Sequence, residues 1–272
     1  MLYALQLALF AGMVGTNRDK VLAEGPLAFA IVLGMAGGYA AAFLISHVFL
    51  RRDLALASLR AISISGPAVP FVGFSVLGHF FGTESAIPIA IAGLVMNLIQ
   101  VPATIVCLTA ATAKQRAAGS RLSFEANMLN TLREPVVWAP LLALLIILTN
   151  VHIPREIQES LSLLGRATGG VALFASGIVL YSRHVAVTPA VCVSVLARNI
   201  VIPALIWGAA LLLGMQAHTV REAVLTLAIP TASIGVILAV QYQVAEQEMA
   251  STLFFSTILS FITMGAFIWL TA

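Results

Sequence analysis

The chain has 272 residues, of which 60% are apolar and only 9% are charged, and its mean hydropathy is +1.03. Soluble domains carry about 25% charged residues, so this composition excludes a soluble enzyme, a nucleic-acid-binding protein and a disordered linker. The formal net charge of +3 is small and is typical of the basic cytoplasmic loops of membrane proteins. The composition therefore predicts an integral membrane protein.

Apolar segments follow one another along the chain, separated by short polar stretches. A helix needs about 20 apolar residues to cross the hydrocarbon core, and a membrane β-barrel would instead alternate apolar and polar residues. These runs are continuous, so we predict an all-α integral membrane protein with about nine spans. The segments are residues 2–15, 26–50, 54–81, 86–112, 136–150, 157–181, 187–215, 220–242 and 250–272.

The distribution of basic residues predicts the orientation. The longest connection, residues 113–133, carries four basic side chains, so we expect it in the cytoplasm together with Met1, and the C-terminus outside. Cys107 and Cys192 lie inside apolar runs, and we expect them to be buried rather than bonded to each other or to a metal. No metal, cofactor or catalytic residue is expected.

Parts of the first half of the chain recur in the second half. The matches include residues 8–11 with 172–175, Pro26 with Pro189, and Gly73 with Gly235. Because the offset drifts by single residues while loops absorb the change, the series indicates an internal repeat. Segments one to four pair with segments six to nine, five positions apart, so the two copies run in opposite directions, as in many secondary transporters.

This repeat predicts three parts: a first repeat over residues 1–112, a cytoplasmic connection over 113–133 and a second repeat over 134–272. The fifth segment has no partner, so we expect one helix to be missing before Met1, roughly 30–40 residues with its loop. A fragment, a misassigned start codon and a naturally shortened protein are the alternatives.

Four stretches share their order and spacing with one known family. They are SGPAVPFVG at 65–73, GGVALFASG at 169–177, Arg198 followed by Pro-Ala-Leu at 203–205, and LAIPTASIG at 227–235. They resemble helices four, seven, eight and nine of the auxin efflux carrier family, especially its bacterial malonate-transporter-like members. The resemblance covers essentially the whole chain. Ala68 and Ser75 depart from the family's pattern, where asparagine and proline are common, so the substrate cannot be copied from any one relative.

The resemblance implies a transporter fold of ten helices in two inverted bundles of five, here with the first helix missing. Helices four and nine would be broken at prolines and would cross at the membrane midplane, where the substrate binds. Helices one, two, six and seven would form a scaffold, and the others the moving transport part.

Prolines inside two of the segments indicate a substrate site. A proline removes a helical hydrogen bond, and in lipid the freed groups must be satisfied by protein or by water. The half-helix that starts at each break presents a positive dipole end, which suits a carboxylate. The alternative is that these prolines only kink packed helices. The substrate-binding residues expected at the breaks are Ser65, Pro67, Pro70, Gly73, Pro230, Thr231 and Ser233, with Ser63 nearby.

Four further polar residues lie deep in apolar segments. Arg198 and Asn199 fall near mid-bilayer, where a charge is a functional hypothesis by default. Arg198 either pairs with a substrate carboxylate or caps carbonyl groups of the broken helices. Asn97 and Gln100, one helical turn apart, either line the cavity or hydrogen-bond another helix.

All eleven acidic residues fall in loops or at segment ends, whereas a proton pump usually carries an embedded carboxylate. Coupling therefore runs through histidine, backbone carbonyls and a cation, or through the missing helix, or the protein is a facilitator. We predict a secondary carrier that moves a small organic anion, a carboxylate such as malonate, by alternating access. The alternatives are a membrane receptor or structural subunit, an inactive truncated carrier, and an intramembrane enzyme, for which no catalytic constellation is visible.

The expected partners are the small organic anion, the lipid bilayer, a coupling cation or proton, and a second copy of the chain in a homodimer. Nucleic acid is not expected. The predicted location is the bacterial cytoplasmic (inner) membrane.

Overall fold

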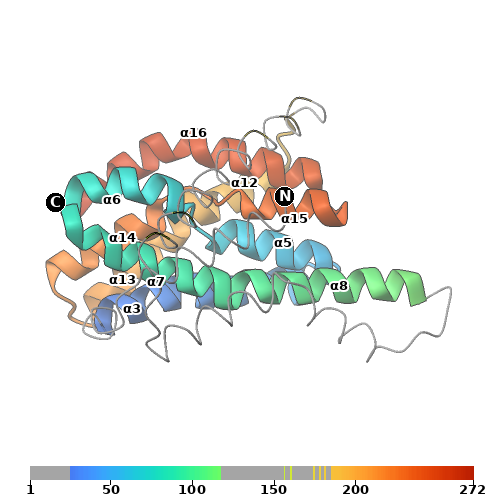
Figure 1. Ribbon diagram of the computed structural model, residues 1–272, viewed down its shortest axis with the longest axis horizontal. Coiled ribbons are helices and arrows are strands. Elements are labelled where there is room, and N and C mark those ends of the chain that lie inside the picture. The colour runs from blue at the N-terminus through green and yellow to red at the C-terminus, as the bar shows by residue number, and fades with distance from the viewer. Residues whose placement is uncertain are drawn as a thin grey trace.

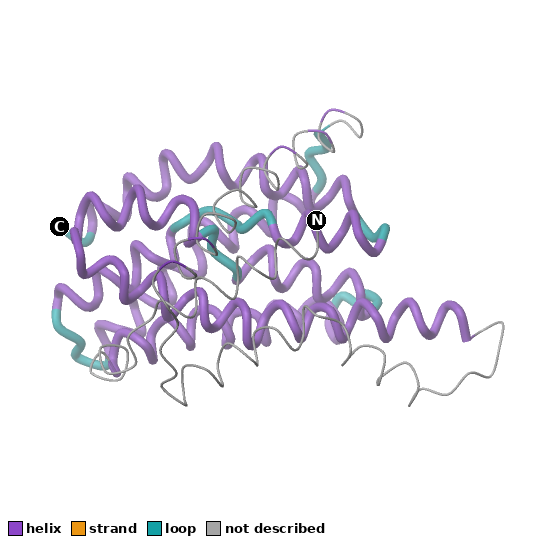
Figure 2. The backbone as a smooth tube through the Cα atoms, viewed as in Figure 1, coloured by secondary structure: helices purple, strands orange, loops and turns teal. Residues whose placement is uncertain are grey.

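The computed structural model describes residues 25–117 and 185–272, with five single positions between them: Glu156, Ser160, Phe174, Ile178 and Tyr181. Within these parts every regular element is a helix and no strand is named, as Figure 2 shows. Four of the described helices are long and apolar enough to cross a membrane: Gly25–Phe49, Ile87–Thr112, Pro189–Leu212 and Glu246–Leu270. The prediction of an all-α membrane protein is confirmed.

Several predicted features lie outside the described residues. These are the segments 2–15 and 136–150, most of 157–181, and most of the connection 113–133. The match between residues 8–11 and 172–175 falls there as well, apart from Phe174. The inverted repeat, the three-part division of the chain, the orientation and the missing helix therefore stay predictions.

Three of the four spans contain a π-helical turn near the middle. The first span is α3 (Gly25–Val32), η1 (Leu33–Gly37), α4 (Gly38–Leu44) and η2 (Ile45–Phe49). The second includes α7 (Ala86–Val95), η5 (Met96–Gln100) and α8 (Val101–Ala117), and the third α12 (Pro189–Leu196), η6 (Ala197–Val201) and α13 (Ile202–Leu212). Such turns are frequent at functional sites. The turns η5 and η6 carry the four polar residues singled out in these spans.

The two proline-containing segments are interrupted, as predicted. In the first, α5 (Leu54–Ser65) ends before Pro67, and the chain continues through η3 (Val69–Gly73), α6 (Phe74–Phe81) and η4 (Gly82–Ser85). In the second, α14 (Ala217–Ala228) ends before Pro230, and α15 (Ile234–Tyr242) follows. The residue before a proline is pushed out of the helical region. Gly66 and Ile229 accordingly have ψ values of 104° and 136°.

The last helix, α16 (Glu246–Leu270), begins earlier than the predicted residue 250. Apolar content alone placed the start too late, because Glu246 and Glu248 lie in the first turn of the helix. Carboxylates at that position are favoured by the positive end of the helix dipole. Glu222, expected at the end of a segment, lies in the first half of α14 and is buried, at 4% exposed.

The helix α5 lies between α8 and α16 and contacts both, as well as α4 and α15 (Figure 1). Large apolar side chains on the outer faces are exposed, for example Leu212 at 91% and Phe261 at 82%, as expected for surfaces that face lipid. Cys192 is also exposed and Cys107 is half-buried, so the prediction that both are buried is wrong for Cys192. It lies on α12, whose outer face includes exposed Val193 and Leu196.

Candidate functional site

The interruptions of the two broken helices bind each other. Pro67 and Thr231 form an isolated antiparallel bridge. The backbone N–H of Ala68 donates to the carbonyl of Pro230 at 2.8 Å, and the N–H of Ala232 donates to the carbonyl of Gly66 at 2.9 Å. All six residues are buried. Backbone groups that the prolines remove from helical bonding are thus satisfied across the crossing, as the interior of a membrane requires.

Side chains from the second break, from α16 and from η6 reinforce this crossing. The hydroxyl of Thr231 donates to the carbonyl of Ser63 at 2.7 Å, and the Thr231 N–H donates to the Ser256 hydroxyl at 3.1 Å. Ser256 in turn donates to Oδ1 of Asn199 at 2.7 Å, while Nδ2 of Asn199 donates to the Ser256 carbonyl at 2.7 Å. Asn199 therefore orients Ser256, which the sequence did not single out, against the second break.

Arg198 is completely buried and holds the carbonyl ends of both broken helices. Its Nε and Nη2 donate to the carbonyl of Ile229 at 3.1 and 2.6 Å, and Nη2 also donates to Leu227 at 3.0 Å. Its Nη1 donates to the carbonyl of Ile64 at 3.3 Å. Of the two roles predicted for Arg198, these contacts are those of the carbonyl cap. Among the described residues no carboxylate forms an ion pair with it.

Gln100 connects η5 to the first broken helix. Its Nε2 donates to the carbonyl of Met35 and to the hydroxyl of Ser65, both at 2.9 Å, and Ser65 donates to the carbonyl of Ala61 at 2.7 Å. The Ser65 hydroxyl is therefore engaged within the protein. By contrast, Oε1 of Gln100 and Oδ1 of Asn97 are buried without a hydrogen-bond partner in the described ranges. Two buried acceptors without partners are rare in a folded protein and call for an explanation.

The remaining predicted residues lie at or just beyond the breaks. Ser233 precedes α15 and is 5% exposed, but its side chain does not cap that helix. Pro70 lies within η3, beyond the crossing itself, and Gly73 ends that turn. A Cβ on Gly73 would come within 3.1 Å of Val69, 3.3 Å of Ile89 and 3.6 Å of Ile229. Gly73 therefore allows the first broken helix to approach α7, which carries Ile89, whereas the distance to Ile229 is an ordinary van der Waals contact.

The carbonyl ends and the N-terminal end of the half-helices at the breaks differ in their hydrogen-bond partners. The carbonyl ends of α5 and α14 receive hydrogen bonds from Arg198, Thr231 and the crossing backbone. The N-terminal end of α15 has no side-chain cap, so its first N–H groups and its positive dipole end are not neutralised by a side chain. Together with the buried guanidinium, this makes the crossing electropositive.

Two other features lie away from the crossing. Arg60 on α5 forms a two-pronged ion pair with Glu248 on α16, with Nε–Oε1 at 2.6 Å and Nη2–Oε2 at 3.0 Å. A cavity of about 360 Å³ lies between α12 and α16 and is lined by apolar side chains, among them Val191, Val195 and Phe255. None of the predicted site residues lines that cavity. Its apolar wall offers no partner for an anion.

Residues 1–268 match the family described as membrane transport protein. Over 248 residues the chain is 29% identical to the uncharacterized transporter YfdV of Escherichia coli (strain K12), and the alignment covers 89% of this chain and 77% of that protein. Proteins of the same name from Escherichia coli O157:H7 and Shigella flexneri match with the same identity and coverage.

Proposed function

Because the chain belongs to the membrane transport protein family, the auxin efflux carriers, we propose that it is a secondary carrier of a small organic anion. Membership in this family and the apolar helices make it an integral protein of the inner membrane that carries out transport. The anionic substrate, a carboxylate such as malonate, and the alternating-access mechanism are our proposal. No enzymatic reaction is part of it.

The charge at the crossing is the observation that carries the proposal. Arg198 is fully buried, and its partners in the described residues are neutral carbonyl groups. Its positive charge is therefore not balanced by an acid there, and the uncapped start of α15 adds a positive dipole end. A buried unbalanced cation is costly, and an anionic ligand lowers that cost. The site therefore favours a carboxylate over a neutral or cationic substrate.

We assign the predicted site residues two kinds of role. Those already engaged with protein groups position the breaks: Arg198, Asn199, Ser65, Gln100, Pro67 and Pro230. Thr231 belongs with them, because its hydroxyl and its N–H are both engaged. The groups that we assign to substrate contact are Ser233 at the start of α15, Asn97 on η5, and the backbone from Pro67 to Gly73. The turn η5 thus supplies one group of each kind, Asn97 and Gln100, whereas η6 supplies two positioning groups, Arg198 and Asn199.

Alternating access requires the two broken helices to move together relative to the scaffold. Their breaks are hydrogen-bonded to each other through Ala68, Gly66, Pro230 and Ala232, which favours motion as one unit. Substrate bound beside this unit would then face one side of the membrane and afterwards the other. A coupling cation or proton and a homodimer remain parts of this proposal that the crossing does not specify.

Uptake of labelled malonate into proteoliposomes tests the proposal. We expect saturable uptake that other small dicarboxylates inhibit and that protein-free liposomes lack. Substrate selectivity is measured with a competition panel of a dicarboxylate, an amino acid and an indole carboxylic acid. Absence of binding to every member of this panel contradicts the assignment of an organic anion.

A further inference from the structure

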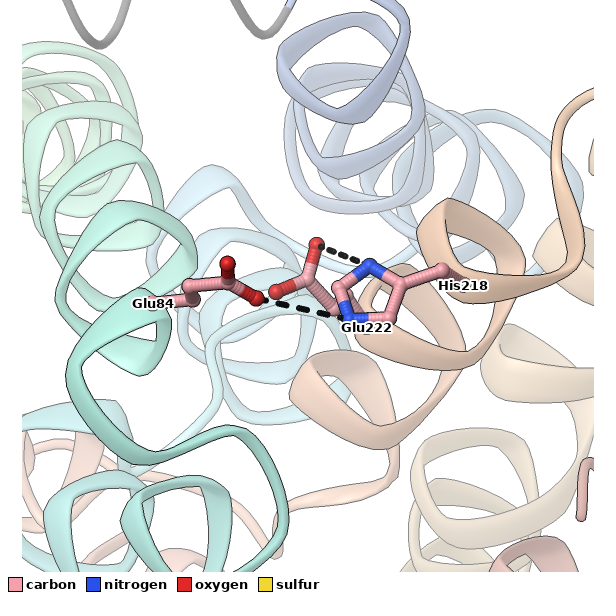
Figure 3. Close-up of side chains that lie close together, drawn as sticks. All are labelled: Glu84, His218 and Glu222. Carbon is pink, nitrogen blue, oxygen red and sulfur yellow. Dashed lines mark ion pairs between the residues drawn. The ribbon is translucent and has the colours of Figure 1, made fainter.

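A histidine and two glutamates from two separate elements meet at one end of the bundle, away from the helix crossing. Glu84 lies in η4, while His218 and Glu222 lie in the first turns of α14. Figure 3 shows the three side chains directed toward one another. Nε2 of His218 lies 3.5 Å from Oε2 of Glu84, and Nδ1 of His218 lies 3.7 Å from Oε2 of Glu222.

The surrounding structure holds these side chains in place. His218 and Glu222 are four residues apart, so they occupy one face of α14. The ring of Phe81 packs edge-on against the His218 ring with centroids 5.6 Å apart. On the other side, the Ser85 hydroxyl donates to the carbonyl of Gly82 at 2.6 Å and closes the turn that carries Glu84. Three potential ligands are therefore presented from a helix and a fixed turn.

The cluster combines a buried carboxylate with an accessible entrance. The side chain of Glu222 is only 6% exposed, whereas those of His218 and Glu84 are 57% and 64% exposed. One ligand atom from each residue lies within 4.8 Å of the others. Rotation of the two exposed side chains can bring all three ligand atoms to about 2.0–2.2 Å from a single ion, which is the length of zinc bonds to nitrogen and oxygen. An ion could enter from solvent and reach the buried Glu222.

The ligand chemistry of the cluster favours a divalent cation. Glu84 and Glu222 offer carboxylate oxygens and His218 offers an imidazole nitrogen, and these atoms lie within 4.8 Å of one another. The guanidinium of Arg221, next along α14, lies over the ring of Phe80 at 5.6 Å from its centroid. One imidazole with carboxylates is a donor set that suits zinc and related metals. We propose that Glu84, His218 and Glu222 form a binding site for a divalent transition-metal ion such as Zn²⁺.

A metal ion here joins the two broken helices at a second place. The turn η4 follows α6, the outer half of the first broken helix, and α14 is the half of the second broken helix that precedes its break. An ion bound by both therefore stabilises their packing beyond the crossing itself. This site is independent of the proposed substrate, so it can be present or absent whatever the carrier transports.

The test uses the full chain, purified in detergent without a polyhistidine tag and depleted of metal with a chelator. Equilibrium binding of Zn²⁺ and the shift in unfolding temperature on adding Zn²⁺ are measured for the parent protein, Glu84→Gln and His218→Gln. Both substitutions change exposed side chains, so folding should persist. His79→Gln is the matched control, because His79 is an exposed histidine of α6 outside the cluster.

We expect one saturable Zn²⁺ site and a higher unfolding temperature in the parent protein and in His79→Gln. In Glu84→Gln and His218→Gln the affinity should fall about tenfold or more, since loss of even an outer partner of a metal ligand costs about 10–100-fold. Absence of saturable Zn²⁺ binding by the parent protein overturns the proposal. Equal affinity in the parent protein and in the two cluster variants also overturns it.

Discussion

The hydroxyl of Thr231, in the second broken helix, donates a 2.7 Å hydrogen bond to the carbonyl of Ser63, in the first. The carbonyl of Ser63 lies in the last turn of α5, where no further helical turn supplies an N–H. A side chain from one break thus replaces a backbone donor lost at the other. The two interruptions therefore stabilise each other.

Thr231→Val tests the contact between the breaks. Valine has the shape of threonine without the hydroxyl, so the buried Ser63 carbonyl loses its donor, at a cost of about 1–3 kcal/mol. We expect a lower unfolding temperature in detergent and slower malonate uptake into proteoliposomes. Thr231→Ser keeps the hydroxyl and should stay close to the parent protein. Equal stability of the valine variant and the parent would show that this hydrogen bond is dispensable.

Arg198→Lys tests whether the positive charge of Arg198 is sufficient or whether the planar shape of its guanidinium is also required. Lysine keeps the positive charge but lacks the planar fork that reaches the carbonyls of Ile64, Leu227 and Ile229. Each carbonyl left unpaired costs about 1–3 kcal/mol, so we expect a marked loss of thermal stability together with a loss of uptake.

Arg52→Lys, at an exposed loop position, is the matched control for the arginine-to-lysine change and should have no effect. An Arg198→Lys protein with normal stability and uptake is incompatible with the bracing role that we assign to the guanidinium.

Asn97→Ala and Gln100→Ala should differ in stability. Gln100 makes two hydrogen bonds through Nε2, each worth about 0.5–1.5 kcal/mol, so its removal destabilises the protein. The Oδ1 of Asn97 has no partner in the described ranges, so Asn97→Ala should leave the unfolding temperature unchanged or higher. If Asn97 contacts substrate, its variant should still show a raised KM for uptake. Unchanged uptake kinetics in Asn97→Ala would remove it from the site.

Gly66→Ala tests how closely the first break is packed. A Cβ at this position would lie 2.7 Å from the carbonyl oxygen of Ile62 and 3.3 Å from Oε1 of Gln100. Forcing atoms into such a space typically costs about 1–3 kcal/mol, so we expect a lower unfolding temperature. Gly208→Ala, where nothing lies within 4 Å, is the control and should be neutral or stabilising by about 0.5–1 kcal/mol. Similar behaviour of the two variants would contradict the packing argument.

Much of the fold was predictable because its signals are local. Long apolar runs predict spans from composition alone, and Pro67 and Pro230 mark interruptions because a proline acts on its own helix. Arg198, Asn199, Asn97 and Gln100 were conspicuous because polar groups are rare at membrane depth. In the described parts of the chain, each of these four residues lies in a π-helical turn. The polar residues singled out from the sequence thus coincide with irregular helix geometry.

Other features depended on contacts between distant segments. Glu248 lies in the first turn of α16 and is held by Arg60 of α5, whereas hydropathy assigned that acid to a loop. Ser256 looked like an ordinary serine of an apolar helix until Asn199 and Thr231 were placed beside it. The exposure of Cys192 likewise follows from which face of α12 is covered, and a sequence window does not contain that information.

Hydropathy and the prolines were enough to predict a helical membrane protein with two broken spans. Lipid offers no hydrogen-bond partners, so each backbone N–H and carbonyl group must be satisfied close by within the protein. The partner of each freed group was decided by packing alone. Arg198 was equally suited to a substrate carboxylate or to carbonyl oxygens, and the approach of α5 and α14 brought three carbonyls within its reach. The meeting of Glu84 with His218 has the same cause, since a hydrogen bond or ion pair depends on distance in space and not on distance along the chain.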